Sequence, residues 1–383
     1  MPVFNTRIEN ALTLRRQSGL TRSVNVFAGA NQALFSKDNQ GYINFSSNDY
    51  LGLAADSEVV ANWQRGLDIY GAGSGASPLV TGQSHAHLGL EETLCDWLGY
   101  ERAVLFVSGF SANQAVLFSL LNKSDLLLQD RLNHASLMEA GSLSPATMKR
   151  FRHNDVSHLE RLLTRSDSSL VVTEGVFSMD GDKAPLKAIS EVTEATDNWL
   201  MVDDAHGIGV LGEDGSGSCA LAGIKPNLLI VTFGKAFGLS GAAVMCDEST
   251  GDYLTQFAKH HVYSTAMPPS QAHSLASTAK MIQQQRWRRE KLTELQGIYN
   301  DALGDVDGFV QTDTPIKPFI CGETDVALSL AENLRNKGFW VTAIRPPTVP
   351  KGSARLRITL TAMHSAEHVK QLCQEIRYAS IEK

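Results

Sequence analysis

Short apolar runs alternate with helical patterns through the middle of the chain. The apolar runs, each too short for a helix, lie at residues 103–107, 126–129, 170–173, 199–202 and 228–232. Between them, residues 111–121, 156–163 and 189–196 place apolar side chains at helical spacing. A strand followed each time by a helix predicts an α/β domain, in which helices cover both faces of a mostly parallel sheet.

The pattern changes near both ends of the chain. Residues 270–300 predict a long helical region, and its charged middle at 286–291 marks an expected domain boundary. Beyond it the sequence predicts a small α+β unit, with strands at 316–320, 340–344 and 354–360 and helices at 325–337 and 366–378. Residues 5–18 predict an amphipathic helix and 37–45 a short hairpin. We therefore expect an N-terminal arm over 1–55, a large domain over 56–285 and a small C-terminal domain over 286–383.

Composition excludes several classes of function. The 383 residues are 43% hydrophobic and 20% charged, as in ordinary globular enzymes, and the net charge of −7 offers no basic face for nucleic acid. No apolar segment is long enough for a bilayer, and residues 1–25 lack the apolar centre of a signal peptide, so we expect a cytoplasmic protein. The five cysteines form no C-x-x-C pair, and the sequence predicts neither a disulfide framework nor a metal site.

One lysine, Lys235, follows the apolar run at 228–232 and is framed by glycines and phenylalanines. A single lysine is usually a solvated surface charge. In apolar surroundings, however, a lysine loses proton affinity, and the neutral amine can then form a Schiff base with a carbonyl group. Lys235 is therefore a candidate catalytic residue.

A carboxylate and an imidazole follow the neighbouring run at 199–202. Asp203 ends this run, and His206 lies three residues beyond it. Because the carboxyl ends of parallel strands meet at one edge of a sheet, we expect both side chains to share a pocket with Lys235. A carboxylate there suits the ring nitrogen of pyridoxal phosphate, which withdraws electrons when it is protonated.

Three further features have both a functional and a structural interpretation. Ser108-Gly109-Phe110 lies between a strand and a helix, which suits a phosphate group but also describes an ordinary βα turn. The arginines at 355 and 357 share one face of a strand, where they could clamp a carboxylate or form a solvated edge. The glycine-rich stretch at 71–78 has the wrong spacing for a dinucleotide site, so we interpret it as an active-site loop or a surface turn.

The order of these motifs resembles the α-oxoamine synthases, a family of fold-type I pyridoxal phosphate enzymes. The resemblance covers nearly the whole chain and rests on NFSSNDYLGL, SGFSANQAV, NHASL, TEGVFSMDGD, VDDAHGIGVLGE, TFGKAFGLSGAA, YSTAMPP, AIRPPTVP and ARLRITLTAMH. It implies a large domain with a mostly parallel seven-stranded sheet, a small α+β C-terminal domain, an N-terminal arm and a homodimer.

The resemblance also implies roles for individual residues. It implies that Lys235 is the Schiff-base lysine, Asp203 the partner of the ring nitrogen, His206 the partner of the ring hydroxyl, and His134 the residue stacked on the ring. Further contacts to the cofactor would come from Gly109, Phe110, Ser178, Thr232 and Thr265, the last in the other subunit. Contacts to substrate would come from Arg22, Asn48, His134, Thr348 and Arg357.

The implied activity is the decarboxylative condensation of L-alanine with a pimeloyl thioester, giving 8-amino-7-oxononanoate for biotin synthesis. Family members that use glycine carry threonine-arginine in the glycine loop, and Ser77-Pro78 stands there in this chain. Three alternatives stay open: a glycine- or serine-using synthase, an aminotransferase, and an inactive regulatory subunit. The acyl carrier is coenzyme A or an acyl carrier protein, and for the protein the basic group Arg15, Arg16 and Arg22 would form a rim.

Overall fold

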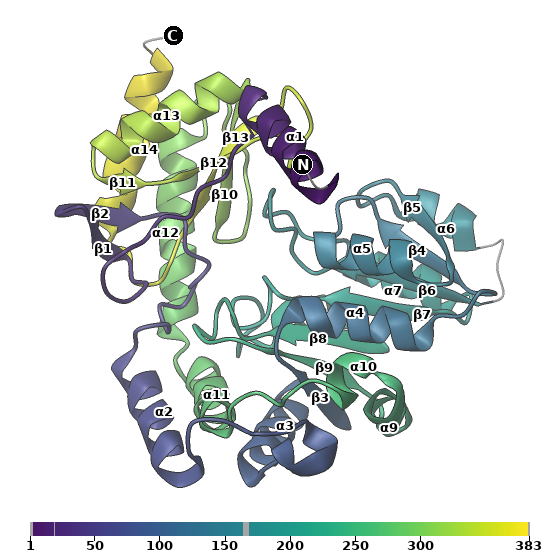
Figure 1. Cartoon of the computed structure of the whole chain (residues 1–383). Coiled ribbons are helices and arrows are strands. Elements are labelled where there is room, and N and C mark those ends of the chain that lie inside the picture. Colours follow the sequence, from purple (N-terminus) through teal and green to yellow (C-terminus); the bar gives the residue numbers. More distant parts are fainter. Residues whose placement is uncertain (1–2, 19, 164–167, 382–383) are drawn as a thin grey trace.

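A large α/β domain forms the bottom and the right of the molecule, and a smaller unit lies at the upper left (Figure 1). The computed structural model describes residues 3–18, 20–163 and 168–381, so the outer limits of the predicted domains, residues 1 and 383, lie outside the described residues. None of the helices in this part of the chain combines the length and the hydrophobicity needed to span a bilayer.

The large domain is built on a seven-stranded sheet of order β3-β9-β8-β7-β6-β4-β5. Only β9 runs against its neighbours, and the other adjacent pairs are parallel. The strands are β3 (Arg102–Phe106), β4 (Leu126–Asp130), β5 (Thr147–Phe151), β6 (Ser169–Glu174), β7 (Trp199–Asp203), β8 (Leu228–Thr232) and β9 (Ala242–Cys246). The predicted seven-stranded, mostly parallel sheet is confirmed.

Helices cover both faces of this sheet. Alternate residues of one strand enter opposite cores: Leu127 packs with α4 and α5, whereas Leu126 and Leu128 face the other side. The helices of the domain are α2 (Ser57–Tyr70), α3 (His85–Leu98), α4 (Gly109–Leu120), α5 (Ala135–Leu143), α6 (Val156–Leu163), α7 (Leu186–Glu194), α8 (Gly217–Ala222), α9 (Glu248–Phe257), α10 (Lys259–Val262) and α11 (Pro269–Gln284), with a π-helical turn at η1 (Pro78–Gly82). Because these helices cover the faces of the sheet, the ends of its strands are left free to form a site.

The long helical region predicted at 270–300 is two helices. The first helix, α11, ends at Gln284. The second, α12 (Trp287–Leu303), then runs from the large domain into the C-terminal unit (Figure 1). That unit contains β10 (Ile316–Gly322), α13 (Thr324–Asn336), β12 (Thr342–Ile344), β13 (Ala354–Thr359) and α14 (Ala366–Ile381). Its sheet is antiparallel, with β13 in the middle of the order β10-β13-β12.

The N-terminal hairpin belongs to the same end of the molecule. β1 (Leu34–Lys37) and β2 (Gln40–Asn44) form the hairpin, and β2 pairs in parallel with β11 (Phe339–Trp340). The prediction of one strand over 340–344 is therefore wrong, because the chain passes at the buried Val341 from this sheet to the sheet of β12 and β13. The division into 1–55, 56–285 and 286–383 stays a prediction.

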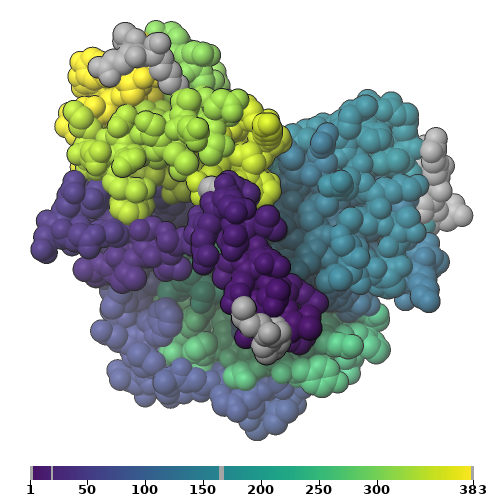
Figure 2. Space-filling model, turned by 45° about the horizontal axis from the view of Figure 1, so that its top comes forward, coloured from purple at the N-terminus to yellow at the C-terminus, as the bar shows by residue number. Residues whose placement is uncertain are grey.

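The arm begins with α1 (Val3–Gln17), which buries none of its side chains. Its apolar residues Phe4 and Ile8 are 70% and 57% exposed. In Figure 2 the arm lies across the front of the seam between the C-terminal unit and the large domain. The arm therefore borders any groove that opens along this seam.

Candidate active site

A cavity of about 320 Å³ opens where β6, β7 and β8 end and α4 begins. The predicted site residues that line it are Asn48, Gly109, Phe110, His134, Asp203, His206, Thr232 and Lys235. Residues up to 187 positions apart in sequence thus meet at the carboxyl edge of the sheet, as expected for an open α/β sheet.

Lys235 is held at the edge of this cavity by the turn that follows β8. Phe233 and Phe237, on either side of it, are fully buried with ring centroids 5.1 Å apart. Gly238 has φ +68°, and a Cβ there would lie 2.2 Å from the Ala54 nitrogen, so the turn requires glycine. Burial lowers the pKa of Lys235 to about 8, although the charges of Asp203 and Glu174 act to raise it. The lysine can therefore supply a neutral amine near neutral pH.

Asp203 is fixed at the end of β7 by two hydrogen bonds. Its Oδ1 accepts from the Ala205 backbone N–H at 3.1 Å, and its Oδ2 accepts from Asn113 Nδ2 at 2.7 Å. Asn113 also donates to the Ser136 hydroxyl at 3.0 Å. That hydroxyl lies 2.8 Å from His134 Nδ1. One hydrogen-bonded chain thus orients both the carboxylate and the imidazole that face the cavity.

His206 lies beside the same cavity as a neutral ring. Burial, helped by the positive charges of Lys235 and Arg357, holds its pKa well below the usual range. Its Nδ1 is 2.5 Å from the Tyr50 hydroxyl. In the tautomer that accepts from this hydroxyl at Nδ1, the ring proton is on Nε2, and His206 can donate one hydrogen bond there.

The beginning of α4 forms a cradle for an anion. The N–H groups of Gly109 and Phe110 are the first of the helix. They have no acceptor within it, because no helical turn precedes them. Thr232 lies against them, because a Cβ on Gly109 would meet its Cγ2 at 2.6 Å. The buried Thr232 hydroxyl has no hydrogen-bond partner among the described residues. A phosphate fits these donors, and with Lys235 and Asp203 in the same cavity the site fits pyridoxal phosphate.

Arg357, in the C-terminal unit, lies beside the cavity and contacts its lining residue Asn48. It lies on β13, the central strand of its sheet, and is buried, so the solvated-edge interpretation of these arginines is wrong. Its Nε donates to the Ser178 carbonyl at 2.6 Å and its Nη1 to Asn48 Oδ1 at 3.0 Å. The neighbouring Arg355 forms an ion pair with Asp180. Arg357 and Asn48 thus form a polar pair beside Lys235 that suits a carboxylate.

Five predicted site residues are not part of the lining of this cavity, and Arg357, which contacts the lining residue Asn48, is one of them. Ser178 is linked to the site only through its backbone carbonyl, which accepts a hydrogen bond from Arg357. Arg22 and Thr348 instead line a groove of about 860 Å³ between the arm, α13 and the 345–348 segment. Thr265 lies next to the glycine loop, where the Ala266 N–H donates to the Ala76 carbonyl at 3.0 Å.

Sequence reasoning missed five polar residues of the site: Tyr50, Asn113, Ser136, Glu174 and Ser240. Glu174 pairs in register with Asp203 across β6 and β7. Burial, together with the Asp203 charge, raises its pKa well above the usual range, and its Oε1 has no partner among the described residues. Its position at the end of an apolar run, like that of Asp203, was a signal that could have identified it.

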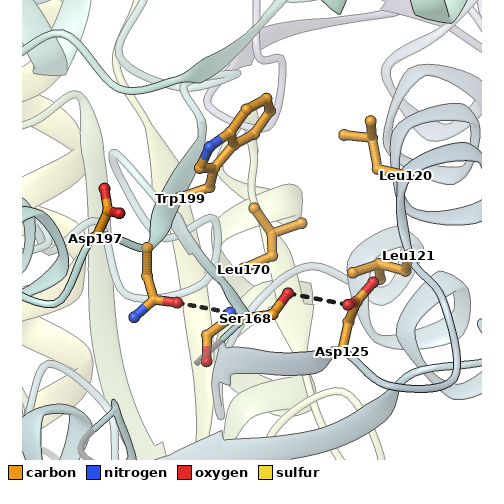
Figure 3. A pocket seen from close by; sticks show the side chains of 9 residues that line it. Leu120, Leu121, Asp125, Ser168, Leu170, Asp197 and Trp199 are labelled. Carbon is orange, nitrogen blue, oxygen red and sulfur yellow. Dashed lines mark hydrogen bonds between the residues drawn. The ribbon is translucent and has the colours of Figure 1, made fainter. Parts of the chain in front are cut away.

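The opposite edge of the sheet carries a different cavity, of about 310 Å³ (Figure 3). It lies where β4, β6 and β7 begin, and Leu170 and Trp199 form its apolar wall. Its lining among the described residues includes no lysine, histidine or arginine. The described residues also include no group of three histidine, cysteine, aspartate or glutamate side chains that could hold a metal.

Comparison with known proteins agrees with this geometry. Residues 40–376 match the family described as aminotransferase class I and II. The chain is 65% identical to an 8-amino-7-oxononanoate synthase of Vibrio parahaemolyticus over 99% of each chain. A serine palmitoyltransferase from S. paucimobilis, with PLP bound to myriocin, superposes with a TM-score of 0.92 at 25% identity over 98% of each chain. An 8-amino-7-oxononanoate synthase from Francisella tularensis superposes with a TM-score of 0.77 at 28% identity, over 88% of this chain and 98% of that one.

Proposed function

Because the chain belongs to the class I and II aminotransferases and, among them, to the 8-amino-7-oxononanoate synthases, we propose that it condenses L-alanine with a pimeloyl thioester. It is a pyridoxal phosphate-dependent enzyme of biotin synthesis. The products of the proposed reaction are 8-amino-7-oxononanoate, carbon dioxide and a free thiol.

One observation carries the choice of an amino acid as first substrate. Arg357 and Asn48, whose side chains are 3.0 Å apart, border the cavity that Lys235 also lines. A guanidinium can bind the carboxylate of an amino acid, and the cavity beside it leaves the amino group near Lys235. The intact lysine and its partners also disfavour the alternative of an inactive regulatory subunit.

The residues of the cavity would divide the work as follows. The amides that begin α4 and the Thr232 hydroxyl hold the phosphate, Asp203 pairs with the ring nitrogen, and His206 donates to the ring hydroxyl. The chemistry that the bound cofactor supplies is an electron-withdrawing ring, which stabilises negative charge at the alanine Cα. The ring of His134, which contacts the Ser136 hydroxyl, would lie against the flat face of the cofactor.

Lys235 moves the proton of this reaction. As a neutral amine, its Nζ removes the proton from the alanine Cα, and it later returns a proton to the same carbon. Between these events the Cα bonds to the pimeloyl carbonyl carbon, the thiol leaves, and the carboxylate departs as carbon dioxide. Arg357 and Asn48 hold that carboxylate until it leaves.

The acyl donor would enter along the groove that contains Arg22 and Thr348. Its volume of about 860 Å³ is ample for an acyl chain, and Arg15, Arg335 and Arg345 also line it. This basic lining suits the phosphate groups of either carrier, coenzyme A or an acyl carrier protein. Comparing the two pimeloyl thioesters as donors would decide between them.

We also propose a cytoplasmic homodimer. Tyr263, next to the segment expected to reach a second subunit, is 80% exposed, and Val107 and Phe110 are exposed at the mouth of the cavity. A second copy of the chain would cover these apolar side chains. A solution mass equal to one chain would refute the dimer, and recovery of the native protein outside the cytoplasm would refute the location.

The test of the proposed function is the choice of amino acid. With pyridoxal phosphate bound, L-alanine and pimeloyl thioester should give free thiol, carbon dioxide and 8-amino-7-oxononanoate, measured by thiol release and mass spectrometry. Productive glycine or serine would instead place the chain with the other condensing enzymes. Transfer of the amino group to the cofactor without thiol release would identify an aminotransferase and refute the proposal.

Replacement of Arg357 should separate amino-acid binding from cofactor binding. In Arg357→Lys the charge remains but the two directed contacts to Ser178 and Asn48 cannot both form. We expect the dissociation constant for alanine to rise about tenfold or more, with little change for pyridoxal phosphate. Titrations of the cofactor absorption with each ligand measure both constants, and an equal loss of both would indicate a structural role.

A further inference from the structure

A tight loop of the large domain, residues 177–183, contacts the C-terminal unit beside the active site. An isolated bridge between Val176 and Lys183 closes its base, and the Phe177 N–H donates to the Asp182 carbonyl at 3.0 Å. At its tip Gly181 has φ +69°, and a Cβ there would lie 2.5 Å from the Ile316 carbonyl oxygen. The loop thus contacts the C-terminal unit through its backbone.

Three side chains of the C-terminal unit contact this loop. Arg355 forms an ion pair with Asp180, and the Thr314 hydroxyl donates to the Gly181 carbonyl at 2.7 Å. Arg357 Nε donates to the Ser178 carbonyl at 2.6 Å. The position of the loop therefore sets the direction of the Arg357 guanidinium.

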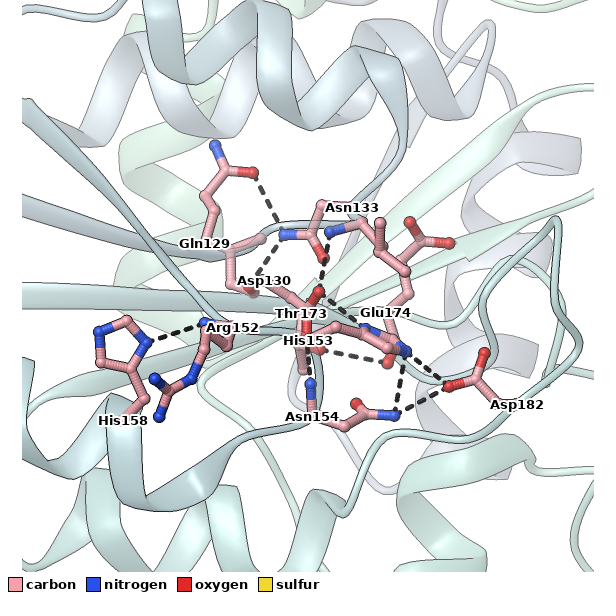
Figure 4. Close-up of polar contacts among 12 residues, drawn as sticks. Gln129, Asp130, Asn133, Arg152, His153, Asn154, His158, Thr173, Glu174 and Asp182 are labelled. Atoms are coloured by element: carbon pink, nitrogen blue, oxygen red, sulfur yellow. Dashed lines mark hydrogen bonds and ion pairs between the residues drawn. The ribbon is translucent and has the colours of Figure 1, made fainter. Parts of the chain in front are cut away.

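The opposite side of the loop contacts His153 and Asn154, which follow β5 in the large domain. His153, which follows β5, lies with Nδ1 3.0 Å from Asp130 Oδ1 and Nε2 2.7 Å from Asp182 Oδ2 (Figure 4). A neutral imidazole carries one N–H, so contact with a carboxylate at each nitrogen requires the charged ring. Burial opposes that charge, but the hydrogen bonds to Asp130 and Asp182 prevail and raise the pKa of His153 to about 10. The ring stays protonated at neutral pH.

Surrounding groups keep this ion triad in place. Asp130 ends β4, is fully buried, and accepts from the backbone N–H groups of Leu132 and Asn154. Asn154 Nδ2 also donates to Asp182 Oδ2 at 2.9 Å (Figure 4). The ring of Phe177 stands edge-on to that of His153, with centroids 4.5 Å apart. His153 is therefore anchored in the large domain and presents one N–H to the loop.

We propose that His153 is a positioning residue for amino-acid binding, which acts through Asp182 and the 177–183 loop to hold the Arg357 guanidinium beside Asn48. This inference rests on the proposed function, in which Arg357 binds the substrate carboxylate. His153 itself does not line the cavity. Its effect reaches the substrate through two directed contacts, His153 to Asp182 and the Ser178 carbonyl to Arg357.

A double-mutant cycle tests this connection. In His153→Phe the ring still packs on Phe177 but both carboxylate contacts are lost, and in Arg357→Lys the final contact is altered. With pyridoxal phosphate bound, we expect His153→Phe to weaken alanine binding about tenfold. In the Arg357→Lys background the same change should add little, because the two residues act in series. Dissociation constants come from the change in cofactor absorption on addition of alanine.

Two readouts separate positioning from general destabilisation. Amide hydrogen exchange at Phe177 and Gly181 should accelerate in His153→Phe without any substrate, and the affinity for pyridoxal phosphate should be unchanged. His158→Phe is the matched control, because His158 Nδ1 accepts from the Arg152 N–H at 3.0 Å and points away from the loop (Figure 4). It should leave alanine binding unchanged. If His153→Phe fails to fold, Asp182→Asn, which keeps an acceptor oxygen but removes the charge, should show a smaller loss of the same kind.

The outcomes distinguish this inference from the proposed function. If Arg357→Lys weakens alanine binding and His153→Phe does not, the positioning role is wrong and the proposed function stands. Equal and additive losses from the two changes would also refute it, since His153 would then act elsewhere. If Arg357→Lys has no effect on alanine binding, the carboxylate site itself is wrong, and the inference falls with it.

Discussion

Lys235→Ala is expected to abolish product formation and the visible absorption that pyridoxal phosphate acquires when it bonds to the lysine. The variant loses the base that removes the proton from the alanine Cα, which alone is worth about 10²- to 10⁴-fold in rate. It also loses the amine that anchors the cofactor. Thiol release from the pimeloyl thioester and the absorption spectrum measure the two effects separately.

A second buried lysine provides the control for this experiment. Lys317 on β10 is fully buried, its Nζ donates to the Thr312 carbonyl at 2.7 Å, and burial lowers its pKa to about 8, as for Lys235. Lys317→Met should lower the melting temperature but keep both the absorption band and turnover. Full activity in Lys235→Ala, or an equal loss in both variants, would contradict the catalytic role of Lys235.

Part of this site was predictable because local sequence determines it. An apolar run that ends in a polar residue predicts both a buried strand and the position of its functional side chain, as with Asp203 at the end of β7. The role of Thr232 at the end of β8 was implied only by the family resemblance. Parallel strands then bring these ends to one edge. The placement of Lys235 near Asp203 follows from this rule.

Other parts were not predictable because they depend on contacts distant in sequence. Asn113 lies within a helical pattern, and only the fold brings it within 2.7 Å of Asp203, 90 residues away. The edge strand β5 has mostly exposed side chains, so no apolar run marks it. Nor does the local pattern at 340–344 show that Val341 separates two sheets, since both halves are equally suited to a strand.

The same limit explains why the strand that carries Arg355 and Arg357 could be predicted but the partners of these arginines could not. The period of two placed Arg355 and Arg357 on one face of a strand. Whether that face meets water depends on the order of strands in the sheet, and β13 is the central one. The 177–183 loop then supplies the partners of both arginines from the other domain.

Adjacent aspartates at the end of β7 allow a sharp test of the second large effect. Asp203→Asn preserves the shape of the side chain and one acceptor for Asn113, but removes the negative charge that would face the ring nitrogen of the cofactor. Without that charge the ring no longer holds the proton that makes it electron-withdrawing, so removal of the alanine Cα proton becomes slow. We expect kcat to fall by about 10²-fold or more, by analogy with the loss of one directed electrostatic contact in other active sites.

Asp204→Asn is the matched control, because Asp204 is equally buried but lies outside the cavity. Its Oδ2 accepts from the Ser218 N–H at 2.8 Å, and burial raises its pKa to about 7, so a neutral side chain is already nearly tolerated there. This variant should keep most of the turnover and all of the cofactor affinity. Rates of thiol release at saturating alanine, with melting temperatures for both variants, decide the matter. A large loss in Asp204→Asn, or none in Asp203→Asn, would show that the chemistry does not depend on a charge at the ring nitrogen.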